Sequence, residues 1–131
     1  MGATQSYILD DSFVADSALA QYRIVVMGGT QGHAAYPAAE DAAKILGVTQ
    51  HSTAASGDTV LVRRAGITKV TVASANITIG LALRAYNIVG MADMQSAMWA
   101  SGDGVLGYAE QASVASGDIV ECWLAIRQLL S

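Results

Sequence analysis

The sequence predicts a small, mainly β domain, a β-barrel or a β-sandwich, organised around an internal duplicated β-unit. Short runs rich in valine, isoleucine and threonine alternate with segments rich in glycine, serine and aspartate, which is typical of strands joined by turns. A pattern of sixteen residues occurs twice along the chain. With 131 residues, 53% of them hydrophobic, the chain is long enough to bury one compact core.

The repeat relates residues 45–60, ILGVTQHSTAASGDTV, to residues 105–120, VLGYAEQASVASGDIV. In each copy a short apolar strand ends at a glycine, a polar segment follows, and Ser-Gly-Asp leads into the next strand. Glycine accepts positive φ values and aspartate bonds to nearby backbone groups, so both tripeptides are predicted to be turns. A calcium loop would need several closely spaced oxygen ligands, which these segments lack. The residues assigned to structural turns are Gly57, Asp58, Gly117 and Asp118.

Short strands and two helices account for most of the remaining chain. Strands are expected at residues 22–27, 59–63, 67–73, 77–86 and 119–126. Helices are expected at residues 37–46, between a proline and a following glycine, and at residues 92–100. The expected organisation is an extended N-terminal arm (1–20), a single β-rich domain (21–126) with repeat units of about 45–66 and 105–126, and a C-terminal tail (127–131).

Composition and charge exclude several classes of protein. The net charge is −4 and the basic residues are scattered, so direct nucleic-acid binding is not expected. No apolar run approaches the roughly 18–20 residues that cross a bilayer, so no membrane span is expected. Cys122 is the sole cysteine and can form neither an intrachain disulfide nor a cysteine pair for zinc. The early residues lack the basic character of a signal peptide, which favours synthesis in a cytoplasm.

One segment has the outline of an enzyme motif. Residues 23–32, RIVVMGGTQG, look like the strand and glycine loop of a dinucleotide-binding unit. No strand–helix alternation follows, and no tyrosine has a lysine four residues later, so no cofactor is expected. His33 and His51 lack close ligand spacing, and Cys122 falls on the apolar face of a strand, where it is expected to act as a small buried hydrophobe. We predict no catalytic, cofactor-binding or metal site, and a protein that is not an enzyme.

The duplicated pattern resembles that of the capsid cement, or head decoration, proteins of tailed phages. The resemblance covers approximately residues 22–126 and depends on turns and strands, while the leader and the tail depart from it. The matching residues are Gly47-Val48-Thr49, Ala55-Ser56-Gly57-Asp58-Thr59-Val60 and Gly66, followed by Gly107-Tyr108-Ala109-Glu110 and Ala115-Ser116-Gly117-Asp118-Ile119-Val120.

The resemblance implies a structural virion protein that is made in the host cytoplasm and binds the outer surface of a phage capsid. It would stabilise the shell by bridging subunits of the major capsid protein, as a homo-oligomer, with a trimer favoured at local three-fold positions. Apolar side chains near the two ends of the chain are the candidates for contact with the capsid or another partner. They are Tyr7, Ile8, Leu9, Phe13 and Val14, then Leu129 and Leu130.

Two alternatives stay open at this point. A virion surface module that binds host glycans would be favoured by an exposed Trp99 or Trp123 with polar neighbours, because sugar faces stack on aromatic rings. A small oligomeric hydrolase would need His33 or His51 beside a carboxylate of a neighbouring subunit.

Overall fold

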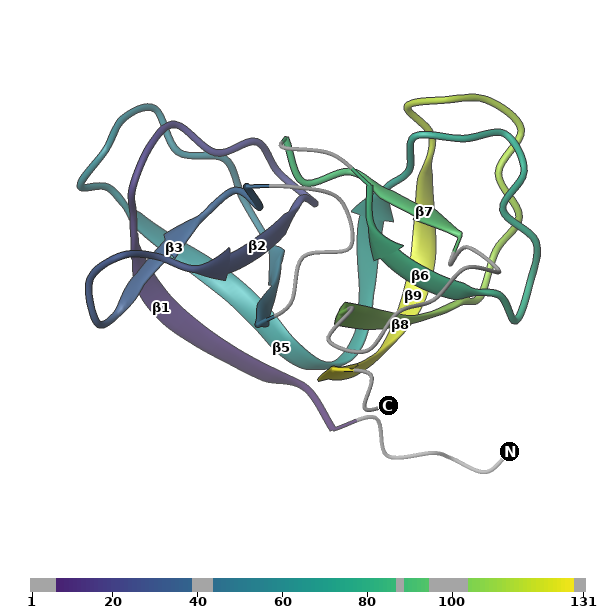
Figure 1. Cartoon of the computed structure of the whole chain (residues 1–131), viewed down its shortest axis with the longest axis horizontal. Helices are drawn as coiled ribbons and strands as arrows, with labels where there is room; N and C mark the ends of the chain where they lie inside the picture. Colours follow the sequence, from purple (N-terminus) through teal and green to yellow (C-terminus); the bar gives the residue numbers. More distant parts are fainter. Residues whose placement is uncertain (1–6, 39–43, 87–88, 95–103, 129–131) are drawn as a thin grey trace.

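The computed structural model describes residues 7–38, 44–86, 89–94 and 104–128. These residues form strands and no helix, so none of them belongs to a helix that could cross a membrane (Figure 1). The mainly β prediction is therefore confirmed. The strands are β1 (Leu9–Ala15), β2 (Ile24–Met27), β3 (His33–Ala35), β4 (Ile45–Thr49), β5 (Thr59–Thr71), β6 (Ala82–Ala85), β7 (Ala92–Met94), β8 (Gly104–Ala109) and β9 (Ile119–Gln128).

The strands form two closed units that share β5 and lie side by side (Figure 1). The first unit has the order β1-β3-β2-β4-β5, and it closes because β1 pairs with both β3 and β5. The second unit has the order β5-β9-β8-β6-β7, and a parallel bridge between Val72 and Ala92 brings β7 back to the end of β5. The fold is thus a pair of small five-stranded barrels, which agrees with the predicted β-barrel class.

Strand β5 belongs to both units because it is 13 residues long. Residues 59–65 pair with β1, whereas residues 66–71 pair with β9. At the change of partner, Gly66 has a φ of 98°, and a Cβ atom there would lie 2.6 Å from the carbonyl oxygen of Tyr7. The two strands predicted at residues 59–63 and 67–73 are therefore one strand, because a glycine bends the chain without ending the pairing.

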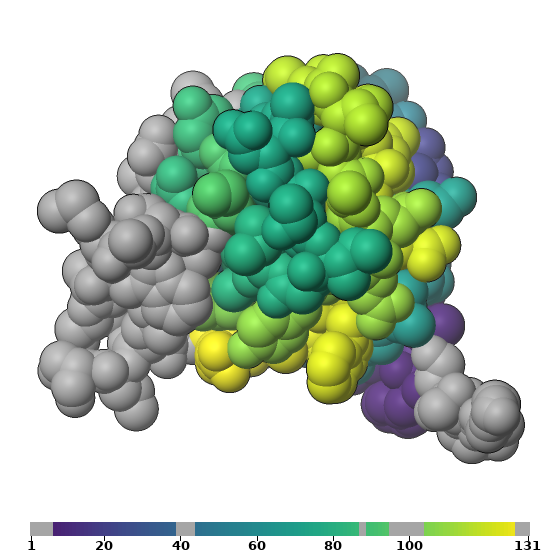
Figure 2. Space-filling view, turned by 90° about the vertical axis from the view of Figure 1, so that its right-hand side faces the viewer, coloured from purple at the N-terminus to yellow at the C-terminus, as the bar shows by residue number. Residues whose placement is uncertain are grey.

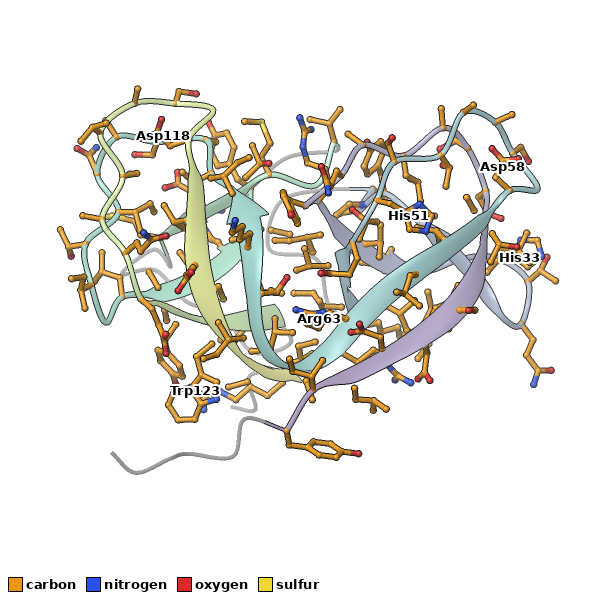
Figure 3. All side chains as sticks on the ribbon, turned by 180° about the vertical axis from the view of Figure 1, so that it is seen from behind. His33, His51, Asp58, Arg63, Asp118 and Trp123 are labelled. Carbon is orange, nitrogen blue, oxygen red and sulfur yellow. The ribbon has the colours of Figure 1, made fainter. Side chains whose placement is uncertain are left out.

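The duplication extends to the hydrogen bonds of each unit. The carboxylates of Asp58 and Asp118 each accept two backbone N–H bonds, at 3.0 and 3.1 Å and at 2.8 and 3.0 Å. His51 and Gln111 each accept the backbone N–H of the residue ten positions later, at 3.1 and 2.8 Å. Figure 3 shows Asp58 and Asp118 at the same end of the two units. The sequence repeat is the most similar part of a duplication that covers a whole barrel.

The hydrophobic core consists of two clusters that join the units. One cluster lies inside the first unit and includes Val25 and Leu46. The other lies inside the second unit and also includes Ile24, Ile45 and Val48 from the first. Because successive side chains of a strand point to opposite faces, β2 and β4 have one face in their own barrel and the other against the second unit. The two barrels therefore share one interface rather than a flexible linker.

Both predicted helices are wrong where the structure describes them. Lys44 has a φ of 61°, which an α-helix excludes, and Ile45 and Leu46 begin β4. Residues 92–94 form β7, which pairs with β6. Tertiary pairing overrides the local helix preference of these alanine- and methionine-containing segments. The rest of the two segments, residues 39–43 and 95–100, and the Glu40-Asp41 pair lie outside the described residues.

The N-terminal segment is part of the first barrel. Residues 9–15, within the expected extended arm, form β1 and have the register Phe13 opposite Val60. Ala15 and Leu19 are completely buried in the core. Asp10 anchors the outer end of this strand through a bidentate ion pair with Arg63, with N–O distances of 2.8 and 3.1 Å. The pairing of β1 on both sides is what closes the barrel.

Candidate functional site

The second unit carries exposed aromatic and aliphatic side chains on the outer face of β8 and β9. Trp123 on β9 is 55% exposed, and Ile67, opposite it on β5, is 37% exposed. Tyr108 lies opposite Trp123 on β8, and the centroids of the two rings are 6.2 Å apart with an interplanar angle of 47°. Ile79, in the turn before β6, is 73% exposed. Figure 2 shows this face, where the turn before β6, β8 and β9 lie side by side.

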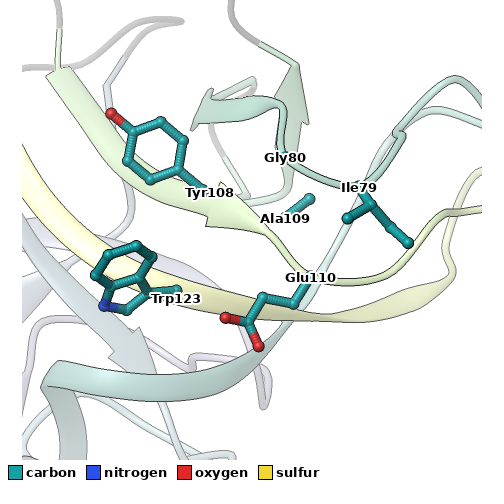
Figure 4. Close-up of a pocket in the computed structure, with 6 residues that line it drawn as sticks. All are labelled: Ile79, Gly80, Tyr108, Ala109, Glu110 and Trp123. Atoms are coloured by element: carbon teal, nitrogen blue, oxygen red, sulfur yellow. The ribbon is translucent and has the colours of Figure 1, made fainter.

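Trp123, Tyr108 and Ile79 border a groove of about 590 Å³ (Figure 4). Its floor is Gly80 and Ala109, whose backbones are joined by a hydrogen bond of 2.8 Å. Gly80 has a φ of 90°, and a Cβ atom there would meet nothing within 4 Å. The groove is therefore open at the position where another residue would project a side chain. The lining residues are Ile79, Gly80, Tyr108, Ala109, Glu110 and Trp123.

The groove has one free carboxylate. Glu110 is exposed, and its carboxylate has no hydrogen-bond or ion-pair partner among the described residues. The hydroxyl of Tyr108, by contrast, accepts a 2.7 Å bond from Arg127, whose guanidinium lies 5.7 Å from the ring centroid. In Figure 4 the carboxylate of Glu110 and the indole of Trp123 lie along the same wall of the groove. The free recognition groups are thus a carboxylate and an aromatic face.

Behind this surface lies Cys122, which is fully buried. Burial, together with the negative charge of Glu110, raises the pKa of the Cys122 thiol to about 12. A thiol with this pKa stays protonated at neutral pH and is a poor nucleophile. Cys122 therefore packs as a small apolar side chain.

The first unit has an equivalent groove that is smaller. Arg63 pairs with Asp10 and Val48 as Trp123 pairs with Ile67 and Tyr108, so Arg63 and Trp123 are equivalent. Likewise, the backbone N–H of Tyr22 bonds to Thr49 at 2.9 Å as that of Gly80 bonds to Ala109. In the first unit the space is about 220 Å³ and is bordered by the side chain of Tyr22 together with Arg63 and residues of the second unit.

The structure places the predicted contact residues in different environments. Tyr7 and Ile8 are exposed, by 73% and 46%, and their main chain passes over Gly66, next to Ile67. Leu9 and Val14 are half-buried, as is Phe13, which packs against the core of the first unit. Leu129 and Leu130 lie outside the described residues. Among the candidates that the structure describes, Tyr7 and Ile8 are thus the exposed ones.

The histidines have partners within their own chain. His33 Nδ1 lies 2.6 Å from Asp16 Oδ1. His51 uses both ring nitrogens on the backbone, at Ser52 and Leu61 (Figure 3). Among the described residues no group of three histidine, cysteine, aspartate or glutamate side chains is close enough to hold a metal ion. The carboxylate beside His33 comes from the same chain, whereas the hydrolase alternative placed it on a neighbouring subunit.

Sequence reasoning missed Ile79, Tyr108 and Glu110 as site residues. The signal lay in the differences between the two repeat copies. Glu110 and Tyr108 replace Gln50 and Val48, which makes the second copy both more acidic and more aromatic. Positions that differ between the two repeat copies are positions at which the fold does not require one particular residue.

Comparison with known proteins identifies a shared fold. The crystal structure described as the N base of the head fiber gp8.5 in bacteriophage phi29 is similar to this chain, with a TM-score of 0.67 and 21% sequence identity. The match covers 95% of this chain and 99% of the other chain. No protein-family model and no curated protein sequence matches. The double-barrel architecture is therefore also that of a solved phage head-fiber base.

Proposed function

We propose that this protein is a structural, non-enzymatic component of a phage virion that binds the outside of the capsid. The observation that carries the proposal is the shared double-barrel fold with a phage head-fiber base over 95% of the chain. The duplicated turn-and-strand pattern, which resembles that of capsid cement proteins, supports the same role independently of that structure. The partner would be the major capsid protein, and bridging of its subunits would stabilise the shell.

An exposed apolar surface suits this role. Trp123 and Ile67 face solvent from neighbouring strands, and the main chain of Tyr7 and Ile8 runs beside them. Burial of such side chains stabilises a contact by roughly 25 cal/mol for each Å² removed from water. A homo-oligomer, with a trimer favoured, would multiply each contact by the number of copies, since linked sites bind with a high effective concentration.

The proposal is tested by adding the purified protein to capsids that lack it. Cryo-electron microscopy measures occupancy and position, and a thermal melt of the shell measures stabilisation. We expect density on the outer surface and a higher melting temperature. Absence of binding, or binding without any gain in shell stability, would contradict the cement role.

The same assay tests the N-terminal contact residues. Deletion of residues 1–8 removes Tyr7 and Ile8 but leaves β1 intact, whereas a longer deletion would remove a core strand. The control is the substitution of exposed Val114, on the far turn, by alanine. Lower occupancy of the truncated protein alone is expected, and equal occupancy would remove this segment from the contact.

One observation supports the host-glycan alternative, and another weakens it. Trp123 is exposed, as that alternative requires. Its neighbours across the strands, Ile67 and Tyr108, are apolar or already bonded, and Glu110 is the one other side chain lining the groove that offers an unpaired polar group among the described residues. We therefore keep capsid binding as the proposed function.

A further inference from the structure

The groove beside Gly80 is the larger counterpart of a space that the first unit lines with its own residues. In the first unit Tyr22 borders the equivalent space next to the fixed cation of Arg63, and the two interact electrostatically. In the second unit a glycine replaces the tyrosine, and a tryptophan replaces the arginine. The second unit thus has an aromatic side chain in place of the arginine, and no side chain at the position equivalent to Tyr22.

The second unit also lacks the neighbour that covers the first. Ile24 and Val48 of the first unit are completely buried against the second barrel. Their equivalents, Ala82 and Tyr108, remain half-exposed. In the first unit this face packs against the other barrel. The equivalent face of the second unit is therefore available for contact with another molecule.

The free groups of the groove select a cation. An indole face is the best aromatic partner for a cation, and Glu110 supplies a carboxylate without a described partner. A guanidinium is planar, stacks on an aromatic face and gives two parallel hydrogen bonds to a carboxylate. A sugar would instead need several polar partners for its hydroxyls, and Ile79, Gly80 and Ala109 offer no polar side chain.

We propose that the groove binds the guanidinium of an arginine side chain from a partner protein, stacked on Trp123 and paired with Glu110. The chain's net charge of −4 complements a basic partner surface. Identification of that partner as the capsid rests on the proposed function, whereas the recognition of arginine does not.

Binding of small probes tests the recognition directly. Two-dimensional NMR follows the Trp123 indole N–H and the amides of residues 79, 80 and 109–110 during titration with N-acetyl-arginine methylamide. The neutral isostere N-acetyl-citrulline methylamide, glucose and N-acetylglucosamine are titrated in parallel. We expect saturable shifts with the arginine probe and weaker ones with the other three. Equal shifts with citrulline, or tighter binding of a sugar, would overturn the proposal.

Substitutions distinguish the groove from its surroundings. Glu110→Gln and Trp123→Ala should each weaken the arginine probe by about fivefold or more. Glu121→Gln, which removes the same charge from the same face, and Ile119→Ala, which removes an exposed apolar side chain from β9, are the controls and should leave it unchanged. Unchanged affinity of both groove variants would contradict the assignment.

Capsid binding separates this inference from the proposed function. If wild-type protein binds capsids and the two groove variants bind equally well, the groove is not the contact and this inference fails alone. If wild-type protein does not bind capsids, the proposed function fails, while the probe titration still decides whether the groove recognises arginine. The expected result is reduced occupancy for Glu110→Gln and Trp123→Ala and normal occupancy for both controls.

Discussion

Tyr22 and Gly80 occupy equivalent positions in the two barrels, and both have positive φ angles, of 59° and 90°. Each donates its backbone N–H to the last residue of the neighbouring strand, Thr49 or Ala109, at 2.9 or 2.8 Å. A left-handed backbone is thus required by the fold at this corner, although glycine meets the requirement in only one unit. The groove beside Tyr22 has a volume of about 220 Å³, and the groove beside Gly80 one of about 590 Å³.

Gly80→Tyr should close the groove with a side chain of the chain itself. A non-glycine residue with positive φ costs about 1 kcal/mol, and part of this cost should be offset by burial of the ring on Trp123 and Tyr108. Gly80→Ala has the same backbone cost without the ring and is the matched control. Urea unfolding should therefore rank the stabilities as wild type, then Gly80→Tyr, then Gly80→Ala. A tyrosine variant no more stable than the alanine variant would show that the ring stays outside.

Gly47→Ala and Gly107→Ala should be strongly destabilising. A Cβ atom at Gly47 would collide with the carbonyl oxygen of Arg63, and one at Gly107 with that of Trp123. Strand backbones cannot yield without loss of pairing, so each substitution should cost about 3 kcal/mol or prevent folding. The control is Gly29→Ala, where a Cβ atom meets nothing within 4 Å and φ is not positive; its change should be within about 0.5 kcal/mol. Similar stabilities for all three variants would contradict the close packing.

Asp58→Ala and Asp118→Ala should destabilise the protein equally. Each carboxylate accepts two backbone N–H bonds and holds the turn that leads into β5 or β9. Loss of these exposed bonds should cost about 1 kcal/mol per site, and the double variant about the sum because the sites lie in separate units. Chemical denaturation measures all three, and a double variant no less stable than either single one would contradict independent turns.

Stability should fall in alkaline solution because of Cys122. Its thiol has a pKa of about 12 in the folded protein against an ordinary value of 9.0. Above about pH 9 the unfolded chain loses this proton while the folded protein keeps it. The free energy of unfolding should therefore decrease by up to about 1.4 kcal/mol per pH unit between these two pKa values. The contribution is fully present below pH 9.

The control for this titration is Cys122→Ala. It should be less stable at neutral pH, because it leaves a small cavity, but its pH profile should be flatter above pH 9. Thiol labelling of the native wild-type protein should also be slow until it unfolds. Rapid labelling of native protein at pH 8, or parallel pH profiles for wild type and variant, would contradict a buried neutral thiol.

The sequence could predict the fold class, the repeat and its turns because these features are local. Val-rich strands show their period within a few residues, and Ser-Gly-Asp specifies a turn through the φ of Gly57 and the carboxylate of Asp58. The two helix predictions relied on equally local preferences, but Ile45 pairs with Val26, and Ala92 pairs with Ala85 and Val72, so both residues belong to strands. Local sequence therefore predicts the turns better than it predicts the strands.

Only the tertiary structure decided which equivalent surface is covered. Val48 and Tyr108 occupy the same place in the two repeat copies, yet one is buried between barrels and the other borders an open groove. Exposure depends on whether another unit packs against a residue, and no short stretch of sequence contains that information. The sequence by itself determined a duplicated β protein, and the shared strand β5 decided where its two halves meet and which face remains free.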